Sequence, residues 1–285
     1  QSSTSSIGLP QPCAEPTGFE PSVHGGGARL DVGDGRPRCM ADLPGEVERE
    51  EILAFLLAKD AQQPRDEPEI AANIHTQLQH MGLSTWSISV HRRLRDAVGR
   101  LQPSTVLEIG ASIGHRTAWL LDQFERADAR PSSMTLVEQG GKFGVILQRL
   151  LQRYEAMPWA RVVVGEPNQL AAEHQAWQLA AATNTELSQT PFEPGYDVIV
   201  IDGPSPQRAG LVASYLPLLN PNGVMFTVEP DMPSGEIDED DEHGMALVNG
   251  FNRWIEVIGD SKETHHLAFM PLFGGTLVAW LPRQA

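Results

Sequence analysis

The amino-acid sequence predicts an α/β fold in which a mostly parallel sheet ends in an antiparallel hairpin. From residue 101 onward, short apolar runs alternate with helical patterns, which is typical of parallel βαβ units with right-handed crossovers. The run Val198–Ile201 is apolar throughout and therefore indicates a sheet that is covered on both faces. Close to the carboxyl end, two apolar runs flank Phe273-Gly274-Gly275, a pattern that predicts a hairpin.

Composition and patterning divide the chain of 285 residues into three predicted parts. Residues 1–39 are rich in Ser, Pro and Gly and lack an apolar period, so we expect a disordered tail. Residues 40–100 carry helical patterns, and we expect them to form a helical cap. The hydrophobic content of 41% supports a sizeable core, which we place in an α/β domain of residues 101–285.

Each predicted element is a short periodic run that is bounded by turn residues. In the cap, the apolar positions within 52–57 predict one helix, and a break at Gly82 separates two more within 66–100. In the α/β domain we expect strands at 106–109, 134–137, 161–164, 196–201 and 224–228, with helices at 117–124, 143–154, 169–182 and 210–219. A helix at 245–258 then precedes the hairpin strands at 266–272 and 276–281.

The charge balance weighs against a nucleic-acid partner. The chain has 37 acidic and 21 basic residues, and its formal net charge of −16 repels phosphate backbones. An acid excess with scarce lysine also suggests the hypothesis of a salt-adapted protein, which a melting temperature that does not rise in molar salt would contradict. The nearest candidate for a basic patch has helical spacing and is expected to be a solvated helix face: Arg92, Arg93, Arg95 and Arg100.

The sequence also bears on compartment. No apolar run approaches the roughly 20 residues that span a bilayer, so no membrane partner is expected. Residues 1–10 lack the basic and apolar regions of a signal peptide, which predicts a cytoplasmic location. Both cysteines, Cys13 and Cys39, precede the predicted folded part, and this excludes a disulfide framework or a cysteine-based metal site there.

The stretch Glu108-Ile109-Gly110-Ala111-Ser112-Ile113-Gly114 follows a predicted strand and opens a predicted helix. Its two glycines allow the backbone to approach a ligand closely. The Gly-x-x-x-Gly spacing differs from the Gly-x-Gly-x-x-Gly of dinucleotide-binding proteins, and Glu108 beside it would repel a phosphate but suits a cationic group. Taken alone, the stretch also fits a tight strand-to-helix turn without a ligand.

Polar residues at the ends of the following strands are further candidates for a ligand site. Glu138 ends the next strand, where an acid accepts hydrogen bonds from ribose hydroxyls in dinucleotide-binding folds. Gly165 and Glu166 follow the third strand, where a polar side chain either meets an adenine amino group or simply forms a turn. Asp202 ends the fourth strand, at the edge where open α/β sheets bind ligands, although an Asp there also caps helices.

These motifs, in this order over residues 101–285, resemble the class I S-adenosylmethionine methyltransferases, and within them the catechol-type O-methyltransferases. Leu107–Gly114 resembles their first motif, Tyr196–Gly203 their fourth-strand motif and Tyr215–Val224 the approach to their fifth strand. Phe251–Trp254 and Pro271–Ala279 are similar to their last helix and closing hairpin. The resemblance implies a Rossmann-like fold with a seven-stranded sheet, preceded here by the helical cap.

The resemblance also implies a cofactor, S-adenosylmethionine, and its site. The family binds this cofactor through positions that here are Glu108, Gly110, Gly114, Glu138 and Glu166. With the neighbouring positions included, the expected cofactor site comprises Glu108, Gly110, Ala111, Ser112, Gly114, Glu138, Gly165, Glu166 and Asp202.

The chain departs from the family at the metal ligands and at the base. Catechol-type enzymes hold a divalent metal with the fourth-strand Asp, here Asp202, and with an Asp-Asn pair that falls on Glu229-Pro230. Proline offers no side-chain ligand, which argues against a divalent metal and leaves its ligands unassigned. Asp231 or the acidic run 236–242 are substitutes, although that run is more typical of a solvated loop. The family's lysine, three residues after the Asp, is Ser205 here.

Methyl transfer to a hydroxyl needs groups that position the acceptor and remove its proton. Asp202 is the first candidate for this catalytic role. Arg208 either orients an anionic substrate or lies on the surface. Four histidines are weaker candidates for the base, because a lone His is more often structural: His75, His80, His91 and His115.

The sequence therefore predicts an S-adenosylmethionine-dependent methyltransferase, with O-methylation of a small molecule as the first interpretation. Two alternatives stay open: a class I methyltransferase that modifies a protein or RNA, and a non-catalytic adenosyl-binding protein whose active site has decayed. The former needs a local basic or extended groove, which the net charge disfavours. The oligomeric state is open, with a homodimer as one option.

Overall fold

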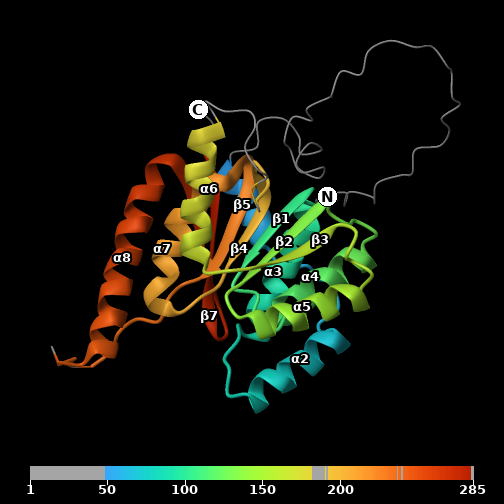
Figure 1. Cartoon of the computed structure of the whole chain (residues 1–285), viewed down its shortest axis with the longest axis horizontal. Coiled ribbons are helices and arrows are strands. Elements are labelled where there is room, and N and C mark those ends of the chain that lie inside the picture. The colour runs from blue at the N-terminus through green and yellow to red at the C-terminus, as the bar shows by residue number, and fades with distance from the viewer. Residues whose placement is uncertain (1–48, 182–189, 191, 236, 239, 284–285) are drawn as a thin grey trace, which may run out of the picture. The chain divides into compact units, whose positions relative to one another are not determined.

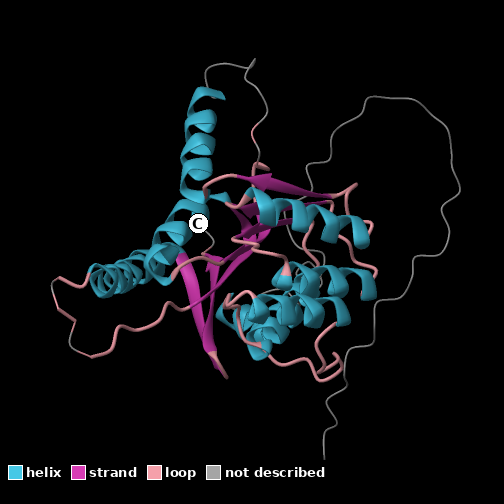
Figure 2. Ribbon diagram, turned by 60° about the horizontal axis from the view of Figure 1, so that its bottom comes forward, coloured by secondary structure: helices cyan, strands magenta, loops and turns pink. Residues whose placement is uncertain are grey.

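In the computed structural model, a seven-stranded sheet lies between two layers of helices (Figures 1 and 2). The structure describes residues 49–181, 190, 192–235, 237–238 and 240–283. Its strands are β1 (Thr105–Ile109), β2 (Ser133–Glu138), β3 (Ala160–Val164), β4 (Tyr196–Ile201), β5 (Leu219–Val228), β6 (His265–Leu272) and β7 (Gly275–Pro282).

The strand order is β3-β2-β1-β4-β5-β7-β6. The first five strands in this order pair in parallel, whereas β7 pairs antiparallel with both β5 and β6. This arrangement confirms the predicted fold, a mostly parallel sheet that ends in an antiparallel hairpin.

Five helices lie on one side of the sheet. They are α1 (Arg49–Leu57), α2 (Glu69–His80), α3 (Ile88–Leu101), α4 (His115–Arg126) and α5 (Gly141–Arg153). Buried side chains from the predicted cap, such as Leu53, Leu78 and Leu94, share one hydrophobic cluster with Trp119 of α4 and Val106 of β1. The cap helices and the helices α4 and α5 therefore bury their apolar faces in the same core.

Three helices lie on the opposite side: α6 (Pro167–Ala181), α7 (Ser205–Tyr215) and α8 (Glu242–Thr264). Their cluster includes Trp254 of α8, Trp280 of β7 and Leu107 of β1. Because successive strand residues point to opposite faces, Val106 and Leu107 enter different clusters. A strand covered on both faces is therefore mostly apolar. Every residue of β4 is buried, and its one charged residue, Asp197, accepts hydrogen bonds from the amides of Ser104 and Thr105.

Boundaries around α7 and α8 differ from the prediction. The helix predicted at 210–219 spans Ser205–Tyr215 and is followed by a short 3₁₀ helix, Leu216–Leu218, that contains Pro217. Proline cannot donate the backbone hydrogen bond that would continue the α-helix. Strand β5 consequently begins at Leu219, which pairs with Tyr196, rather than at the predicted residue 224. Helix α8 begins earlier than predicted because Asp241 accepts a hydrogen bond from the Gly244 amide and caps it, and the helix also continues beyond residue 258 to Thr264.

Some predictions fall beyond the part of the chain that the structure describes. The tail 1–39, residues 40–48 of the cap and the predicted helix end at Ala182 are among them. Within the described ranges, each helix is too short or too polar to serve as a membrane span.

The sheet reverses its strand order between β1 and β4, and the loops after these strands meet there. The Asp202 amide donates to the Ile109 carbonyl at 2.9 Å, and the Gly110 amide donates to Val137 at 3.0 Å. In open α/β sheets, ligands bind in the crevice at such a switch point, outside the carboxyl ends of the strands. The topology therefore places the glycine turn, Glu138 and Asp202 at one edge.

We predict that Gly110→Ala lowers the free energy of unfolding by at least about 2 kcal/mol. Gly110 has φ +73°, and a Cβ at this position would collide with the backbone oxygen of Asp202. Gly141→Ala is the matched control, because nothing lies within 4 Å of its Cβ position. Urea denaturation of both variants checks the prediction, and equal midpoints would contradict the close approach of the two loops.

Candidate functional site

The glycine turn after β1 has three residues with left-handed backbone conformation: Gly110 (φ +73°), Ser112 (φ +54°) and Gly114 (φ +91°). Glycine is required at Gly114 also because a Cβ there would collide with the Leu150 side chain of α5. Gly114 provides no side-chain cap to α4, so the first amides of this helix stay open toward the turn. An open helix N-terminus favours an anionic ligand group.

Glu138 lies directly against the glycine turn. Its Oε2 accepts a hydrogen bond from the Ser112 amide at 2.7 Å, and its Oε1 accepts one from the Gly140 amide at 2.9 Å. The carboxylate is thereby fixed between the loop after β1 and the loop after β2. This is the acid that the sequence assigns to the ribose hydroxyls.

Gly165 and Glu166 lie at the end of the neighbouring strand β3. The Gly165 amide donates to the Glu138 carbonyl at 3.1 Å, which ties this loop to the acid. Glu166 is partly exposed, and its Oε2 accepts from the Gln169 amide at 2.6 Å. Desolvation of this carboxyl raises its pKa, but the hydrogen bonds from Gln169 and Asn168 together outweigh this effect and lower the pKa of Glu166. Glu166 thus lies just after β3, beside the predicted site, and its carboxylate caps the first turn of α6.

Glu108 is fully buried beneath the turn and has its own partners. Its Oε1 pairs with Arg116 Nε at 3.1 Å, and its Oε2 accepts from the Thr117 hydroxyl at 2.9 Å. Burial raises the pKa of Glu108, while Arg116 and the Thr117 hydroxyl act against this rise. In this conformation the carboxylate faces α4, so its effect on a ligand passes through Arg116.

Arg116 was not singled out by the sequence, yet it connects the parts of the site. Its Nη1 pairs with Asp202 Oδ2 at 3.0 Å, and its Nη2 donates to the Gly110 carbonyl at 2.9 Å. The guanidinium stacks on the Trp86 ring with its carbon 4.5 Å from the ring centroid. A buried arginine next to a buried glutamate is expected only when both charges are paired. The sequence feature that could have indicated Arg116 is its position in the first turn of a helix that begins at the carboxyl edge of the sheet.

Asp202, the predicted catalytic residue, lies between two guanidinium groups. Arg116 occupies its Oδ2, and Arg208 Nη2 lies 3.5 Å from its Oδ1. Arg208 is buried rather than on the surface, and its Nη1 also donates to the carbonyls of Val228 and Glu229 at 3.1 and 3.3 Å. Burial lowers the pKa of Arg208, and Asp202 acts against this change.

A divalent metal does not fit at Asp202. The guanidinium of Arg208 occupies the space between Asp202 and the backbone of Glu229, where catechol-type enzymes would need ligands. Asp231 accepts a hydrogen bond from the Ser205 hydroxyl at 3.0 Å. Residues 236 and 239 of the acidic run lie outside the described residues, and Asp241 caps α8. The guanidinium groups of Arg116 and Arg208 therefore flank Asp202, the one expected metal-ligand position that carries an aspartate.

The histidine candidates gather on the cap side of the glycine turn. The rings of His91 and His115 lie 4.4 Å apart, and those of His75 and His115 lie 5.0 Å apart. Both ring nitrogens of His115 have partners, Thr85 Oγ1 at 2.9 Å and Glu67 Oε1 at 2.6 Å. His115 therefore faces the cap rather than Asp202. His80 is exposed.

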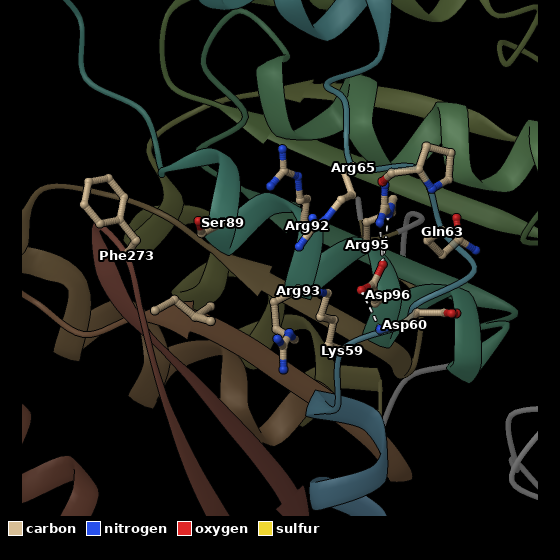
Figure 3. Close-up of a pocket in the computed structure, with 12 residues that line it drawn as sticks. Lys59, Asp60, Gln63, Arg65, Ser89, Arg92, Arg93, Arg95, Asp96 and Phe273 are labelled. Atoms are coloured by element: carbon tan, nitrogen blue, oxygen red, sulfur yellow. Dashed lines mark hydrogen bonds and ion pairs between the residues drawn. The ribbon is translucent and has the colours of Figure 1, made fainter.

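Arginines 92, 93, 95 and 100 do not form the solvated face that their spacing predicted. Arg95 is buried and pairs with Asp96 at 2.6 Å, while Arg93 and Arg100 donate to carbonyls that follow α1 or end it. With Lys59 and Arg65, some of them surround a pocket beside the tip of the β6–β7 hairpin, where Phe273 is 88% exposed (Figure 3). Arg93, Arg95 and Arg100 donate to backbone carbonyls of the segment 56–64 and thereby hold this segment on α3.

Comparison with known proteins provides the context for this geometry. No protein-family model and no curated protein matches the amino-acid sequence. Among solved structures, the O-methyltransferase of Bacillus cereus in complex with S-adenosylhomocysteine is 18% identical, with a TM-score of 0.55 over 81% of this chain and 97% of that one.

The chain has the fold of the class I methyltransferases. The O-methyltransferase TomG of Streptomyces achromogenes, involved in tomaymycin synthesis and solved with S-adenosylmethionine, is 17% identical with a TM-score of 0.54, over 82% of this chain and 96% of that one. A methyltransferase of Podospora anserina bound to S-adenosylhomocysteine is 14% identical with a TM-score of 0.53, over 85% of this chain and 98% of that one. At these identities the resemblance establishes the fold alone.

We predict that Arg116→Met destabilises the protein by about 3–5 kcal/mol near neutral pH, because it leaves the Glu108 charge buried and unpaired. Without Arg116, the pKa of Glu108 rises further above its ordinary value of 4.5. The folded state then holds a proton that the unfolded state has lost, so stability falls as the pH rises from that ordinary value through the raised pKa. The defect is therefore expected to shrink in acidic buffer.

Urea denaturation at about pH 5 and about pH 8 measures this difference. Arg126→Met is the control on the same helix, since Arg126 makes a partly exposed i,i+4 pair with Asp122 and its loss is expected to cost less than about 1 kcal/mol. Adding Glu108→Gln to Arg116→Met removes the buried charge and is expected to restore part of the stability. A defect that is independent of pH would contradict the buried ion pair.

Proposed function

We propose that the chain is an S-adenosylmethionine-dependent methyltransferase that methylates a hydroxyl of a small molecule. The observation that carries this proposal is the contact of Glu138 with the glycine turn, at 2.7 Å from the Ser112 amide, at the switch point of the sheet. This contact brings a carboxylate for ribose hydroxyls and an open helix N-terminus together at one edge. Solved structures with the same fold contain S-adenosylmethionine or S-adenosylhomocysteine, which supports the choice of cofactor.

The residues present fit this cofactor. Glu138 offers two carboxylate oxygens, Gly165 and Glu166 lie at the adjoining strand end for the adenine, and the open amides of α4 face the turn. Once bound, S-adenosylmethionine supplies an electrophilic methyl group for an in-line displacement. We propose that Glu108 acts through Arg116, which fixes the backbone of Gly110.

Asp202 and its two arginines form the acceptor side of the proposed site. Arg116 and Arg208 share the oxygens of Asp202, which leaves little room there for a metal ion. We propose that Asp202 orients these guanidinium groups, and that they attract an acceptor oxygen whose proton passes to solvent water as the methyl group is transferred. The Trp86 ring covers the guanidinium of Arg116 on one side.

The two alternatives differ from this proposal in their observable products. A methyltransferase for protein or RNA requires an extended groove, and the net charge of −16 disfavours an RNA. A decayed adenosyl-binding protein binds the cofactor without turnover. Formation of S-adenosylhomocysteine with a panel of phenols and aliphatic alcohols, compared with protein and RNA acceptors, separates the three.

We predict that the protein binds S-adenosylmethionine with a dissociation constant below millimolar, and that Glu138→Gln weakens binding by about 10-fold or more, because it replaces a charged acceptor. Glu263→Gln, an exposed position on α8, is the control and is expected to bind like the parent. Isothermal titration calorimetry measures both. Absence of binding at millimolar cofactor would refute the methyltransferase and the adenosyl-binding alternatives together.

We also predict that magnesium leaves the affinity for S-adenosylmethionine unchanged, since Arg208 occupies the space that a divalent ion at Asp202 would need. The same titration is repeated with added Mg²⁺. A tighter complex with Mg²⁺ would show that the two guanidinium groups move away from Asp202, and would contradict this part of the proposal.

A further inference from the structure

Glu67, His75 and His115 bring their ligand atoms within 4.8 Å of one another, the one group of this kind among the described residues. They come from three separate segments: the loop before α2, the helix α2 and the first residue of α4. This cluster is separate from Asp202, since His115 faces the cap. Neither the sequence motifs nor the proposed methyl transfer accounts for it.

The spacing within the cluster suits a tetrahedral metal ion. Glu67 Oε1 lies 2.6 Å from His115 Nε2, and its Oε2 lies 3.3 Å from His75 Nδ1. The two imidazole rings have their centroids 5.0 Å apart. Two imidazoles that bind one Zn²⁺ ion through nitrogens at about 2.0–2.1 Å place their ring centroids roughly 5 Å apart. The rings therefore need little movement to share an ion, whereas the 2.6 Å contact between Glu67 and His115 must lengthen to roughly 3.3 Å, the separation of two ligand atoms on a tetrahedral Zn²⁺ ion.

The remaining polar atoms of the cluster have partners that fix its orientation. His115 Nδ1 lies 2.9 Å from Thr85 Oγ1, and His75 Nε2 accepts from the side-chain amide nitrogen of Gln79 at 3.4 Å. When His75 binds an ion through Nδ1, its Nε2 carries the proton, and the Gln79 amide must turn so that its oxygen accepts it. Trp119 Nε1 donates to Glu67 Oε1 at 3.3 Å. Such outer contacts hold metal-binding imidazoles in one ring orientation and are typical of metal sites.

His91 provides a second, independent observation. It is 1% exposed, and its ring lies 4.4 Å from that of His115. Its Nδ1 lies 3.0 Å from the Ser87 carbonyl, so Nδ1 carries the proton, and Nε2 is a buried acceptor with no hydrogen-bond partner in the described part of the chain. A buried polar atom without a partner costs stability. The His91 ring therefore brings one more imidazole close to the cluster, and its Nε2 makes no hydrogen bond within the described residues.

We propose that Glu67, His75 and His115 bind a divalent transition-metal ion of the Zn²⁺ type, with water completing its coordination. Two nitrogen ligands and one carboxylate suit zinc, whereas magnesium and calcium require oxygen ligands throughout. The side chain of His75 is 26% exposed and that of His115 is 3% exposed, so an ion enters from the side of α2. The bound ion joins α2 to the first turn of α4.

A simpler arrangement of the same residues makes the opposite prediction. In it, Glu67 is only a hydrogen-bonded bridge between the two imidazoles, and the protein takes up no ion. Direct measurement of metal uptake separates the two, and this readout is independent of methyl transfer. Failure of the methyltransferase proposal would therefore leave this one intact.

The experiment uses the full chain without an affinity tag, freed of metal with a chelator and titrated with Co²⁺ and then Zn²⁺. We expect one Co²⁺ per chain with the visible absorption of four-coordinate cobalt, its displacement by Zn²⁺, and a higher melting temperature with either ion. His75→Ala is expected to lower the affinity for Zn²⁺ at least about 100-fold. His80→Ala, an exposed histidine on the same helix, is expected to bind like the parent.

Circular dichroism of the metal-free variants shows whether each is folded, so that a loss of binding is assigned to the ligand alone. Should His75→Ala fail to fold, Glu67→Gln keeps the size of the side chain and serves as the second ligand variant. Absence of Co²⁺ and Zn²⁺ uptake by the parent would overturn the proposal. Equal Zn²⁺ affinity in His75→Ala, His80→Ala and the parent would also overturn it.

Discussion

The buried guanidinium of Arg116 is the contact on which the ligand edge of the sheet depends. It pairs with Glu108 beneath β1, with Asp202 at the end of β4 and with the carbonyl of Gly110. Taking these charges out of water costs several kcal/mol per ion, and only their mutual pairing offsets this cost. One side chain from α4 therefore helps to hold Gly110 and Asp202 in the positions that the sheet and its backbone hydrogen bonds give them. Trp86 of the cap covers this side chain, so the cap contributes to the same constraint.

In the proposed function, Arg116 and Arg208 also determine which methyl acceptors the site favours. A metal ion accepts several oxygens in open positions, whereas a guanidinium offers a fixed, planar set of donors. Arg208 donates to Asp202, to the Gly203 carbonyl and to the backbone carbonyl at the end of β5. Arg116 pairs with Glu108 and Asp202 and donates to the Gly110 carbonyl. Both guanidinium groups therefore stay charged independently of dissolved ions, and Glu108 and Asp202 balance their charge. An acceptor oxygen that becomes anionic during the proposed transfer gains from the fixed orientation of the donors rather than from a net positive charge.

The sheet could be predicted from the sequence because its signal is local. A strand buried on both faces is apolar over most of its length, and β4 has consecutive apolar residues at Val198–Ile201. Pro217 is a local signal for the end of α7, whereas the early start of β5 could not be predicted because the pairing of Leu219 with Tyr196 depends on the neighbouring strand. The same distinction between local and tertiary signals applies to the proposed site. Gly110, Glu138 and Asp202 could be predicted to lie near one another because the carboxyl ends of parallel strands meet at one edge.

Residues that act through a tertiary partner left a weaker trace in the sequence. A charged side chain is normally expected at the surface, so the burial of Arg116 becomes understandable only once Glu108 and Asp202 are seen on either side of it. Glu67 gave no signal at all, because its partners His75 and His115 lie on different helices and only the packing of α2 against α4 brings them together. Spacing along the chain cannot reveal ligands that are collected from separate segments.

The first turn of α4 connects these two sets of contacts. His115 and Arg116 are successive residues, and successive residues of a helix point in different directions. His115 points to the cap and its cluster with Glu67, whereas Arg116 points to Glu108 and the sheet. An ion bound by His115 restricts the same turn that holds Arg116 and the open amides at the glycine turn. When the ion is already bound, this turn is ordered before the cofactor binds, so cofactor binding loses less conformational entropy. By thermodynamic reciprocity, whatever factor the ion adds to the affinity for the cofactor, the cofactor adds to the affinity for the ion.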